Sequence, residues 1–74
     1  MIQEFDRVIL TTDIPEYSLA QGDIGTIVLV HQGSRGYEVE FVTLDGDTVA
    51  VISLYNEQIR PISSREIAHA RVIS

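Results

Sequence analysis

Apolar and polar residues alternate most regularly between Tyr37 and Phe41. Tyr37, Val39 and Phe41 share one face of this segment, and Glu38 and Glu40 share the other. An alternation of period two is typical of a β-strand with one buried face. The segment is therefore predicted to be a strand whose aromatic and aliphatic side chains belong to the core.

Four further segments are predicted to be strands, because they are rich in the β-branched and aromatic residues that suit a pleated, half-buried surface. They span residues 5–10, 25–31, 48–54 and 59–62. The second is a nearly continuous apolar run. A sharply curved strand that serves two faces of a small barrel would explain it, with Gly25 allowing the bend.

Turn residues separate these strands. Residues 33–36 (Gly-Ser-Arg-Gly) are predicted to close one hairpin, and Asp45-Gly46 a second, as a type I′ turn with positive φ at both central residues. Residues 55–58 are predicted to form one 3₁₀ turn. Pro61 has no N–H to donate to a ladder, so it is expected at a sheet edge or a strand end.

Residues 11–23 contain the breakers Pro15 and Gly22 and show no periodicity, so they are predicted to form a long ordered loop. Loops of this length in compact domains are often functional. Five short strands and one long loop predict an all-β, SH3-like antiparallel barrel over residues 1–62. The predicted core is Phe5, Val8, Leu10, Ile27, Val39, Phe41, Ile52, Leu54 and Ile59.

Residues 63–74 form a C-terminal tail of different character. Ser63 and Glu66 match a capping box, and Ile67, Ala70 and Ile73 would share a helical face. A strand face over Ala68, Ala70 and Val72 fits equally well. We predict a short helix, with disorder as the main alternative, and we expect the tail to be dispensable for folding.

Composition narrows the possible functions. The chain has 74 residues, no cysteine and a net charge of −6, so disulfides and thiolate-bound zinc are impossible. Residues 1–62 carry ten acidic side chains against three arginines, a balance of −7. This field opposes nucleic-acid binding, which depends on contacts to phosphate. The acidic N-terminus resembles neither a signal peptide nor a membrane anchor, so we expect a cytoplasmic protein.

Several of these segments resemble the small bacterial family known as domain of unknown function 4926. The resemblance covers about residues 1–62 and rests on Phe5-Asp6-Arg7-Val8, Gly22-Asp23-Ile24-Gly25-Thr26, Tyr37-Glu38-Val39-Glu40-Phe41, Asp45-Gly46 and Ile59-Arg60-Pro61. It implies an SH3-like barrel and no known reaction. It also implies a two-protein module, since some members are encoded beside another small protein.

The Gly-Asp-x-Gly turn at 22–25 is also similar to the KOW element of ribosomal and transcription-elongation proteins. Those proteins carry basic residues around the turn. Here the loop holds Asp13, Glu16 and Asp23 and no cation. A KOW-like nucleic-acid-binding function therefore ranks behind the alternatives below.

Polar residues offer few candidates for chemistry. Asp23 is expected to bond nearby backbone N–H groups and fix its turn, and Asp6 to be partly buried and paired with an arginine or a backbone donor. His31, Glu38 and Glu40 could meet across the hairpin and bind a metal, but a solvated face is the simpler interpretation. No nucleophile setting or phosphate loop is present, so we predict a non-enzyme without cofactors.

Two tyrosines suggest a binding surface. Tyr17 lies in the long loop and Tyr55 in the predicted 3₁₀ turn, two regions that line the ligand groove of SH3-type peptide binders. We predict a protein-binding site on these residues, with an acidic rim made of Glu16, Glu38, Glu40 and Glu57. Two ordinary, half-exposed tyrosines are the plainer alternative.

The predicted function is a non-enzymatic protein-interaction module of a small bacterial two-protein system, with a basic and co-encoded protein as partner. Aromatic rings at a converging loop and turn, and acidic residues around them, favour this interpretation. A structural or oligomerising subunit is the alternative. A nucleic-acid-binding or metal-dependent function comes third.

Overall fold

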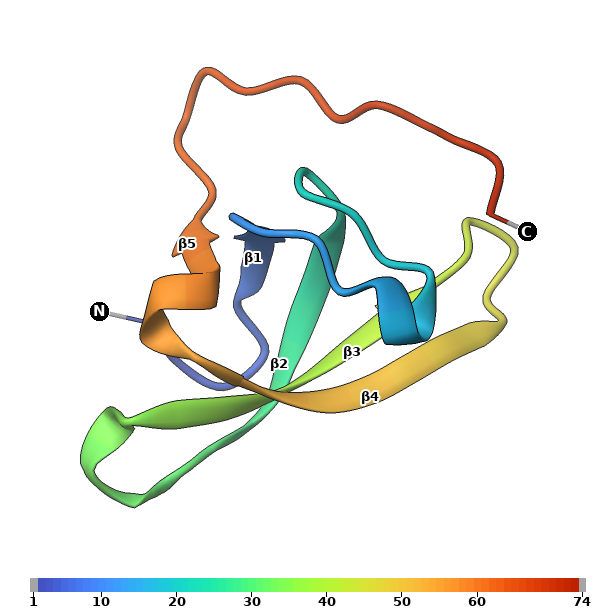
Figure 1. The fold of residues 1–74 in the computed structure, drawn as a ribbon. Helices are drawn as coiled ribbons and strands as arrows, with labels where there is room; N and C mark the ends of the chain where they lie inside the picture. The colour runs from blue at the N-terminus through green and yellow to red at the C-terminus, as the bar shows by residue number, and fades with distance from the viewer. Residues whose placement is uncertain (1, 74) are drawn as a thin grey trace.

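One curved antiparallel sheet forms the protein (Figure 1). The computed structural model describes residues 2–73. The strands are β1 (Arg7–Leu10), β2 (Ile24–Val30), β3 (Gly36–Val42), β4 (Thr48–Tyr55) and β5 (Ile59–Pro61), and three 3₁₀ turns join them, η1 (Pro15–Tyr17), η2 (Gln32–Ser34) and η3 (Asn56–Gln58). The predicted all-β fold with five strands is confirmed.

The sheet order is β4-β3-β2-β1-β5, so the first and last strands of the chain are neighbours. Leu10 pairs with Ile59, and Val8 pairs with Pro61. β5 therefore lies at an edge of the sheet, where the missing N–H of a proline is tolerated. This order, together with the strong curvature of the long strands (Figure 1), is consistent with an SH3-like barrel.

The bend of β2 explains its unbroken apolar run. Its pairing with β3 shifts register between Ile27 and Leu29, as a bulged strand does. Gly25 acts mainly through close packing. A Cβ atom there would lie 2.6 Å from Val39 Cγ1 and 2.8 Å from Phe41 Cε1. The glycine thus lets two core side chains rest directly on the β2 backbone.

Both predicted hairpins form, but one turn differs from the prediction. In the first, the His31 N–H donates to the Gly36 carbonyl at 2.9 Å. In the second, only Gly46 has positive φ (+97°), so the type I′ prediction is wrong. The turn is wider because Gly46 N donates to Thr43 O at 3.0 Å and Thr43 N donates to Asp47 O at 2.8 Å.

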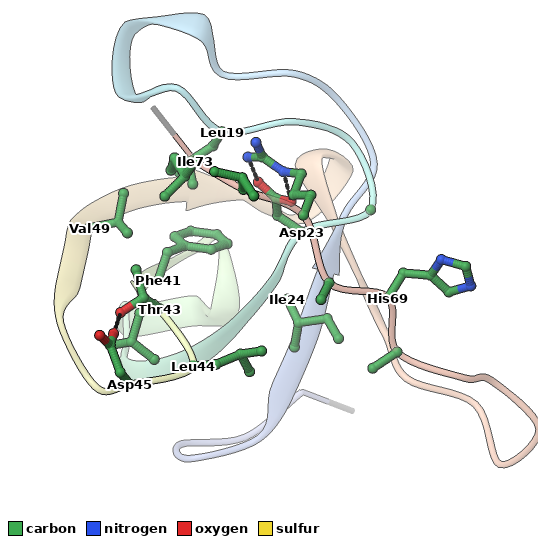
Figure 2. A pocket seen from close by; sticks show the side chains of 16 residues that line it. Leu19, Asp23, Ile24, Phe41, Thr43, Leu44, Asp45, Val49, His69 and Ile73 are labelled. Carbon is green, nitrogen blue, oxygen red and sulfur yellow. Dashed lines mark hydrogen bonds and ion pairs between the residues drawn. The ribbon is translucent and has the colours of Figure 1, made fainter.

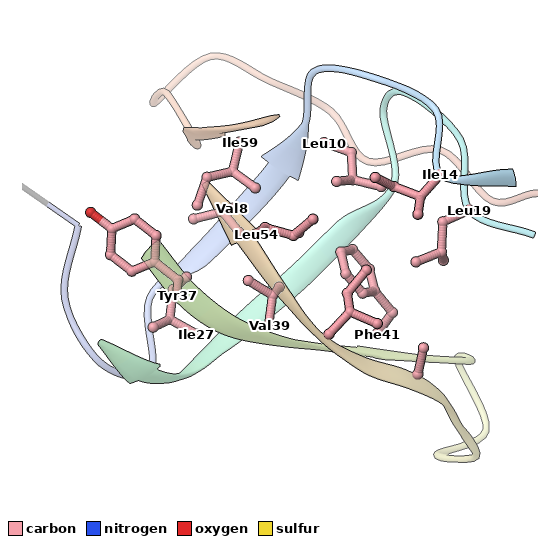
Figure 3. Close-up of a cluster of buried hydrophobic side chains, with 12 residues drawn as sticks. Val8, Leu10, Ile14, Leu19, Ile27, Tyr37, Val39, Phe41, Leu54 and Ile59 are labelled. Carbon is pink, nitrogen blue, oxygen red and sulfur yellow. The ribbon is translucent and has the colours of Figure 1, made fainter. Parts of the chain in front are cut away.

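The core lies against the concave face of the sheet (Figure 3). Eight of the nine predicted core residues are buried: Val8, Leu10, Ile27, Val39, Phe41, Ile52, Leu54 and Ile59. Phe5 is the exception, at 74% exposed. Its N–H bonds to Ile27 O at 2.7 Å in a turn with φ +71°, and β1 begins only at Arg7. Its backbone is hydrogen-bonded to β2 of the sheet, while its ring is exposed to solvent.

The long loop supplies core residues that the sequence pattern did not reveal. Ile14 and Leu19 are 9% and 4% exposed, and Figure 3 shows both beside Leu10. Their backbones pair as an isolated bridge, with Ile14 N donating to Leu19 O at 2.9 Å. The loop is therefore folded against the core through Ile14 and Leu19, and η1 between them has no buried residue.

The tail is not a helix, contrary to the prediction. Residues 63–73 run as extended coil back across the molecule toward the β3–β4 turn (Figure 1). Ser63 N donates to Glu66 Oε2 at 2.9 Å, so the predicted capping contact forms without a helix behind it. Ile67 is 88% exposed. A short helix gains its stability from burying an apolar face, and residues 63–72 of this tail are exposed.

Each of the three helical turns is only three residues long. Within residues 2–73, no helix has the length and apolar character needed to cross a membrane.

Candidate protein-interaction site

A shallow hollow lies between the long loop and the β3–β4 face of the sheet. Its volume is about 460 Å³, and we call it the interaction hollow. It is lined by Ile14, Glu16, Tyr17, Glu38, Val51, Ile52, Ser53, Leu54 and Gln58. Three of the six predicted binding residues, Glu16, Tyr17 and Glu38, therefore meet at one place.

Hydrogen bonds tie the long loop to η3 at one end of the hollow. Thr11 N donates to Gln58 O at 2.9 Å, and Thr11 Oγ1 donates to Glu57 O at 2.8 Å. Loop and 3₁₀ turn converge as the sequence suggested. The contact fixes the distance between the elements that carry Tyr17 and Tyr55.

Tyr17 is displayed by a rigid local structure. Pro15 begins η1, and Ser18 ends it in the left-handed conformation (φ +59°). The buried residues Ile14 and Leu19 anchor both sides of this turn. The Tyr17 ring is left 48% exposed. A partner could cover it without rearranging the loop, which keeps the entropic cost of binding low.

Tyr55 and two of the predicted rim residues lie outside the lining of the hollow. Tyr55 ends β4, is 67% exposed, and donates its N–H to Gln58 Oε1 at 2.8 Å. Glu40 accepts a hydrogen bond from Thr48 Oγ1 at 3.1 Å. Glu57 contributes its carbonyl oxygen to the bond from Thr11. These residues could meet only a partner larger than the hollow itself.

Glu38 is the most strongly bonded carboxylate of the hollow. Ser53 Oγ donates to its Oε2, and His31 Nε2 lies 2.7 Å from the same oxygen. These bonds, that from Ser53 first, hold the pKa of Glu38 below its ordinary value. Gly36 makes room for the imidazole, because a Cβ there would lie 3.1 Å from His31 Nδ1.

The order of these groups does not suit nucleophilic catalysis. In an activated serine, the hydroxyl donates to an imidazole that a carboxylate orients. Here the carboxylate of Glu38 stands between Ser53 and His31. Glu40 does not join them, and no group of three metal-binding side chains occurs within residues 2–73. The arrangement fixes the position of a carboxylate on the surface.

Asp23 fixes its turn as predicted, and it also binds an arginine of the tail. Its Oδ2 accepts from Ala20 N at 2.9 Å. Arg71 of the tail also binds it, with Nε 2.8 Å from Oδ1 and Nη2 2.5 Å from Oδ2. The Arg71 bonds, more than any other contact, lower the pKa of Asp23. The sequence feature that pointed toward this ion pair is the charge of the tail, which holds two arginines, Arg65 and Arg71, against one acid, Glu66.

Asp6 is paired with a backbone donor, as predicted, but it is exposed and not partly buried. Its Oδ2 accepts a hydrogen bond from Gln3 N at 2.9 Å, so a backbone donor satisfies it. The residue is exposed rather than partly buried. It caps the turn that precedes β1.

Comparison with known proteins gives one match. The family model described as domain of unknown function (DUF4926) matches residues 4–61, which covers every strand and stops before the tail. No curated protein and no solved structure matches the chain.

Proposed function

Since the chain belongs to the DUF4926 family of domains of unknown function, we propose that it is a non-enzymatic protein-interaction module. The observation that carries this proposal is the interaction hollow, where a rigidly mounted Tyr17 stands beside Glu16 and Glu38. Tyrosine offers large contact area at low entropic cost, and it is enriched among residues that dominate binding energy.

The chemistry of the hollow suits a basic partner. Its lining contains two carboxylates and no lysine or arginine, and the whole chain carries a net charge of −6. Such a field accelerates the approach of a positively charged protein and repels nucleic acid. We therefore propose a basic protein partner, co-encoded with this chain and met in the cytoplasm.

The partner can be found by pull-down from the native host with mass spectrometry, and the site by substitution. Tyr17→Ala combined with Tyr55→Ala should weaken binding of the captured partner by about 2 kcal/mol or more. Of the two single variants, Tyr17→Ala should carry most of the loss, because only Tyr17 lines the hollow. Isothermal titration calorimetry would measure each affinity.

Phe5→Ala is a matched control, since Phe5 is an aromatic residue at 74% exposure that does not line the hollow. It should leave the affinity unchanged. Wild-type affinity of the double tyrosine variant would refute the proposed face.

A structural or oligomerising subunit remains the second candidate, because β4 is an open edge. It ends the sheet order, and β3 is its one partner strand within residues 2–73. An exposed edge strand is a template for pairing with another chain. Light scattering of the purified protein distinguishes the two functions, since a concentration-dependent dimer would favour the subunit.

A further inference from the structure

A second, larger hollow lies at the other end of the long loop, beneath the tail. Its volume is about 540 Å³, and we call it the tail groove. The apolar side of the groove is formed by Leu19, Ile24, Phe41, Leu44 and Val49, and the tail forms the facing wall with residues 68–73 (Figure 2). It shares no lining residue with the interaction hollow.

The tail is bonded to the barrel near each of its two ends. Near its start, Arg60 Nη1 and Nη2 each donate to the carboxylate of Glu66 at 2.7 Å. Near its far end, Arg71 binds the long loop, and Ile73, beside Leu19 in Figure 2, is partly buried. Within the described residues, no hydrogen bond joins residues 67–70 to the barrel. His69 lines the groove, but Figure 2 shows its imidazole ring directed away from Phe41. The middle of the tail therefore spans the groove without filling it.

The unfilled volume follows from side-chain size. Ala68 and Ala70 line the groove and each contributes only a methyl group. A space of about 540 Å³ lies within the range of small-ligand sites, roughly 300–1,000 Å³. Phe41 and Val49 border this space (Figure 2). An occupant with larger aliphatic side chains at the positions of the two alanines would remove more apolar surface from water.

The long loop provides a preformed binding site for a guanidinium group, made of the Asp23 carboxylate and the Ser18 carbonyl, which we call the arginine seat. Arg71 Nη2 donates to Ser18 O at 2.9 Å in addition to its two bonds with Asp23. Asp23 is itself held in place, since its N–H bonds to Ala20 O at 3.0 Å and its carbonyl accepts from Leu10 N at 2.9 Å. Its side chain is only 18% exposed. Three fixed acceptors suit the planar fork of arginine and not the single ammonium of lysine.

We propose that the tail groove is a docking site for an extended segment of a partner protein that carries an arginine and, one and three residues before it, large aliphatic side chains. The arginine takes the seat on Asp23 and Ser18, and the aliphatic side chains fill the space over Phe41. The chain's own tail is an incomplete version of this ligand. It has the arginine and lacks the bulk, so it covers the groove until a better-fitting segment displaces it.

The tail is covalently tethered to its own site, and this tethering determines how strongly it competes with a partner for the groove. A segment joined to its own site by a short linker competes at an effective concentration in the millimolar range. Removing the guanidinium of the tail should therefore raise the apparent affinity for an added peptide by about tenfold or more. A tail that does not compete for the groove would leave the affinity for the peptide unchanged, so the measured affinity shows whether the tail is displaced.

The probe is a labelled peptide with the sequence of residues 63–74 that carries Ala68→Leu and Ala70→Leu. The receptors are the full-length wild-type chain and the full-length Arg71→Ala variant, compared by fluorescence anisotropy. We expect the variant to bind the peptide about tenfold more tightly than wild type does. Peptide-induced NMR shifts should centre on Leu19, Ile24 and Phe41.

Two matched variants test the chemistry. The same peptide with Arg71→Lys should bind about tenfold more weakly, since the donors of an ammonium radiate from a single nitrogen and do not reach the positions that the planar guanidinium fork reaches. Ala68→Leu with Ala70→Leu in the full-length chain should fill the groove from within and lower peptide binding below the wild-type level. This second variant keeps the wild-type Asp23–Arg71 contact, so it tests the proposal even if Arg71→Ala misfolds.

Equal binding of the peptide by wild type and Arg71→Ala, or shifts outside the groove, would overturn the proposal. A wild-type dimer that Arg71→Ala dissociates would overturn it in favour of the tail of a second copy. Tyr55→Ala should leave peptide binding unchanged, because Tyr55 does not line the groove. Failure here is thus distinguishable from failure of the interaction hollow.

Discussion

The barrel and the tail are held together by different forces. Between Arg7 and Pro61, every strand contributes buried aliphatic or aromatic side chains to one continuous core. From residue 63 to 73, the chain relies on charged contacts at its two ends, Glu66 with Arg60 and Arg71 with Asp23. Burial of apolar surface is the main source of folding free energy, and exposed ion pairs contribute little.

The contrast shows that one chain can carry a stable part and an exchangeable part side by side. A cooperative core opens only by global unfolding, whereas a segment with few buried contacts opens locally at low free energy. The boundary falls just after β5, close to where the match to the family model ends at residue 61.

The largest effect should come from emptying the core. Ile27 is fully buried, and Ile27→Ala should lower the free energy of unfolding by about 3 kcal/mol. For a domain of this size, the thermal midpoint measured by circular dichroism should fall by more than about 10 °C. Ile67→Ala is the matched control, since Ile67 is 88% exposed and should shift the midpoint by about a degree at most. Similar losses in both variants would contradict the contrast between barrel and tail.

Removal of residues 63–74 should have a smaller effect. Residues 63–72 are all exposed, so their loss should cost about 1 kcal/mol or less and change the thermal midpoint by a few degrees. Denaturant unfolding of the shortened chain would measure it. Collapse of that chain would show that the tail completes the core or an interface.

Acid should release the tail with the smallest change in overall stability. Arg71 lowers the pKa of Asp23 below its ordinary 3.8, and Arg60 lowers the pKa of Glu66 to about 2. A lowered folded-state pKa stabilises the folded form above the ordinary value, and that contribution is lost as the pH falls through the folded pKa.

The NMR signals of Ile73 and Leu19 should therefore stay constant from pH 7 to about 4 and change only below that. Asp23→Asn should show the released spectrum at every pH. A transition of the wild-type signals near neutral pH would identify another titrating group as the one that holds the tail.

Sequence periodicity correctly predicted the strands in which apolar and polar residues alternate because one face is buried and the other exposed. β3 and β4 each have one face in the core, so Val39 and Ile52 were identified correctly. Phe5 was wrong because a turn with positive φ precedes β1, and a hydrophobicity pattern carries no information about that backbone angle. Ile14 and Leu19 were missed because loop residues are buried without any period.

The candidate site was predicted in part for a related reason. The alternation at Glu38 placed that carboxylate on the outer face of β3, and the convergence of loop and 3₁₀ turn followed from the fold. Tyr55 was predicted to line the site together with Tyr17 from the 3₁₀ turn, but it ends β4 and lies outside the lining of the hollow. The pairing of Arg71 with Asp23 joins residues at distant places in the chain, and no local pattern encodes it.

The pairing of β1 with β5 also sets an order of events during folding. The pairings β1–β2, β2–β3 and β3–β4 join neighbours in sequence, while the pairing of β1 with β5 must wait for the far end of the chain. Contacts between distant segments form late, because closing a long loop is entropically unfavourable. Asp23 is held by the N–H of Ala20 and by Leu10 at the end of β1. These contacts join residues of one local segment, so we expect the arginine-binding acceptors of the loop to be in place before β5 closes the barrel, and the tail, which follows β5, to meet a site that is already formed.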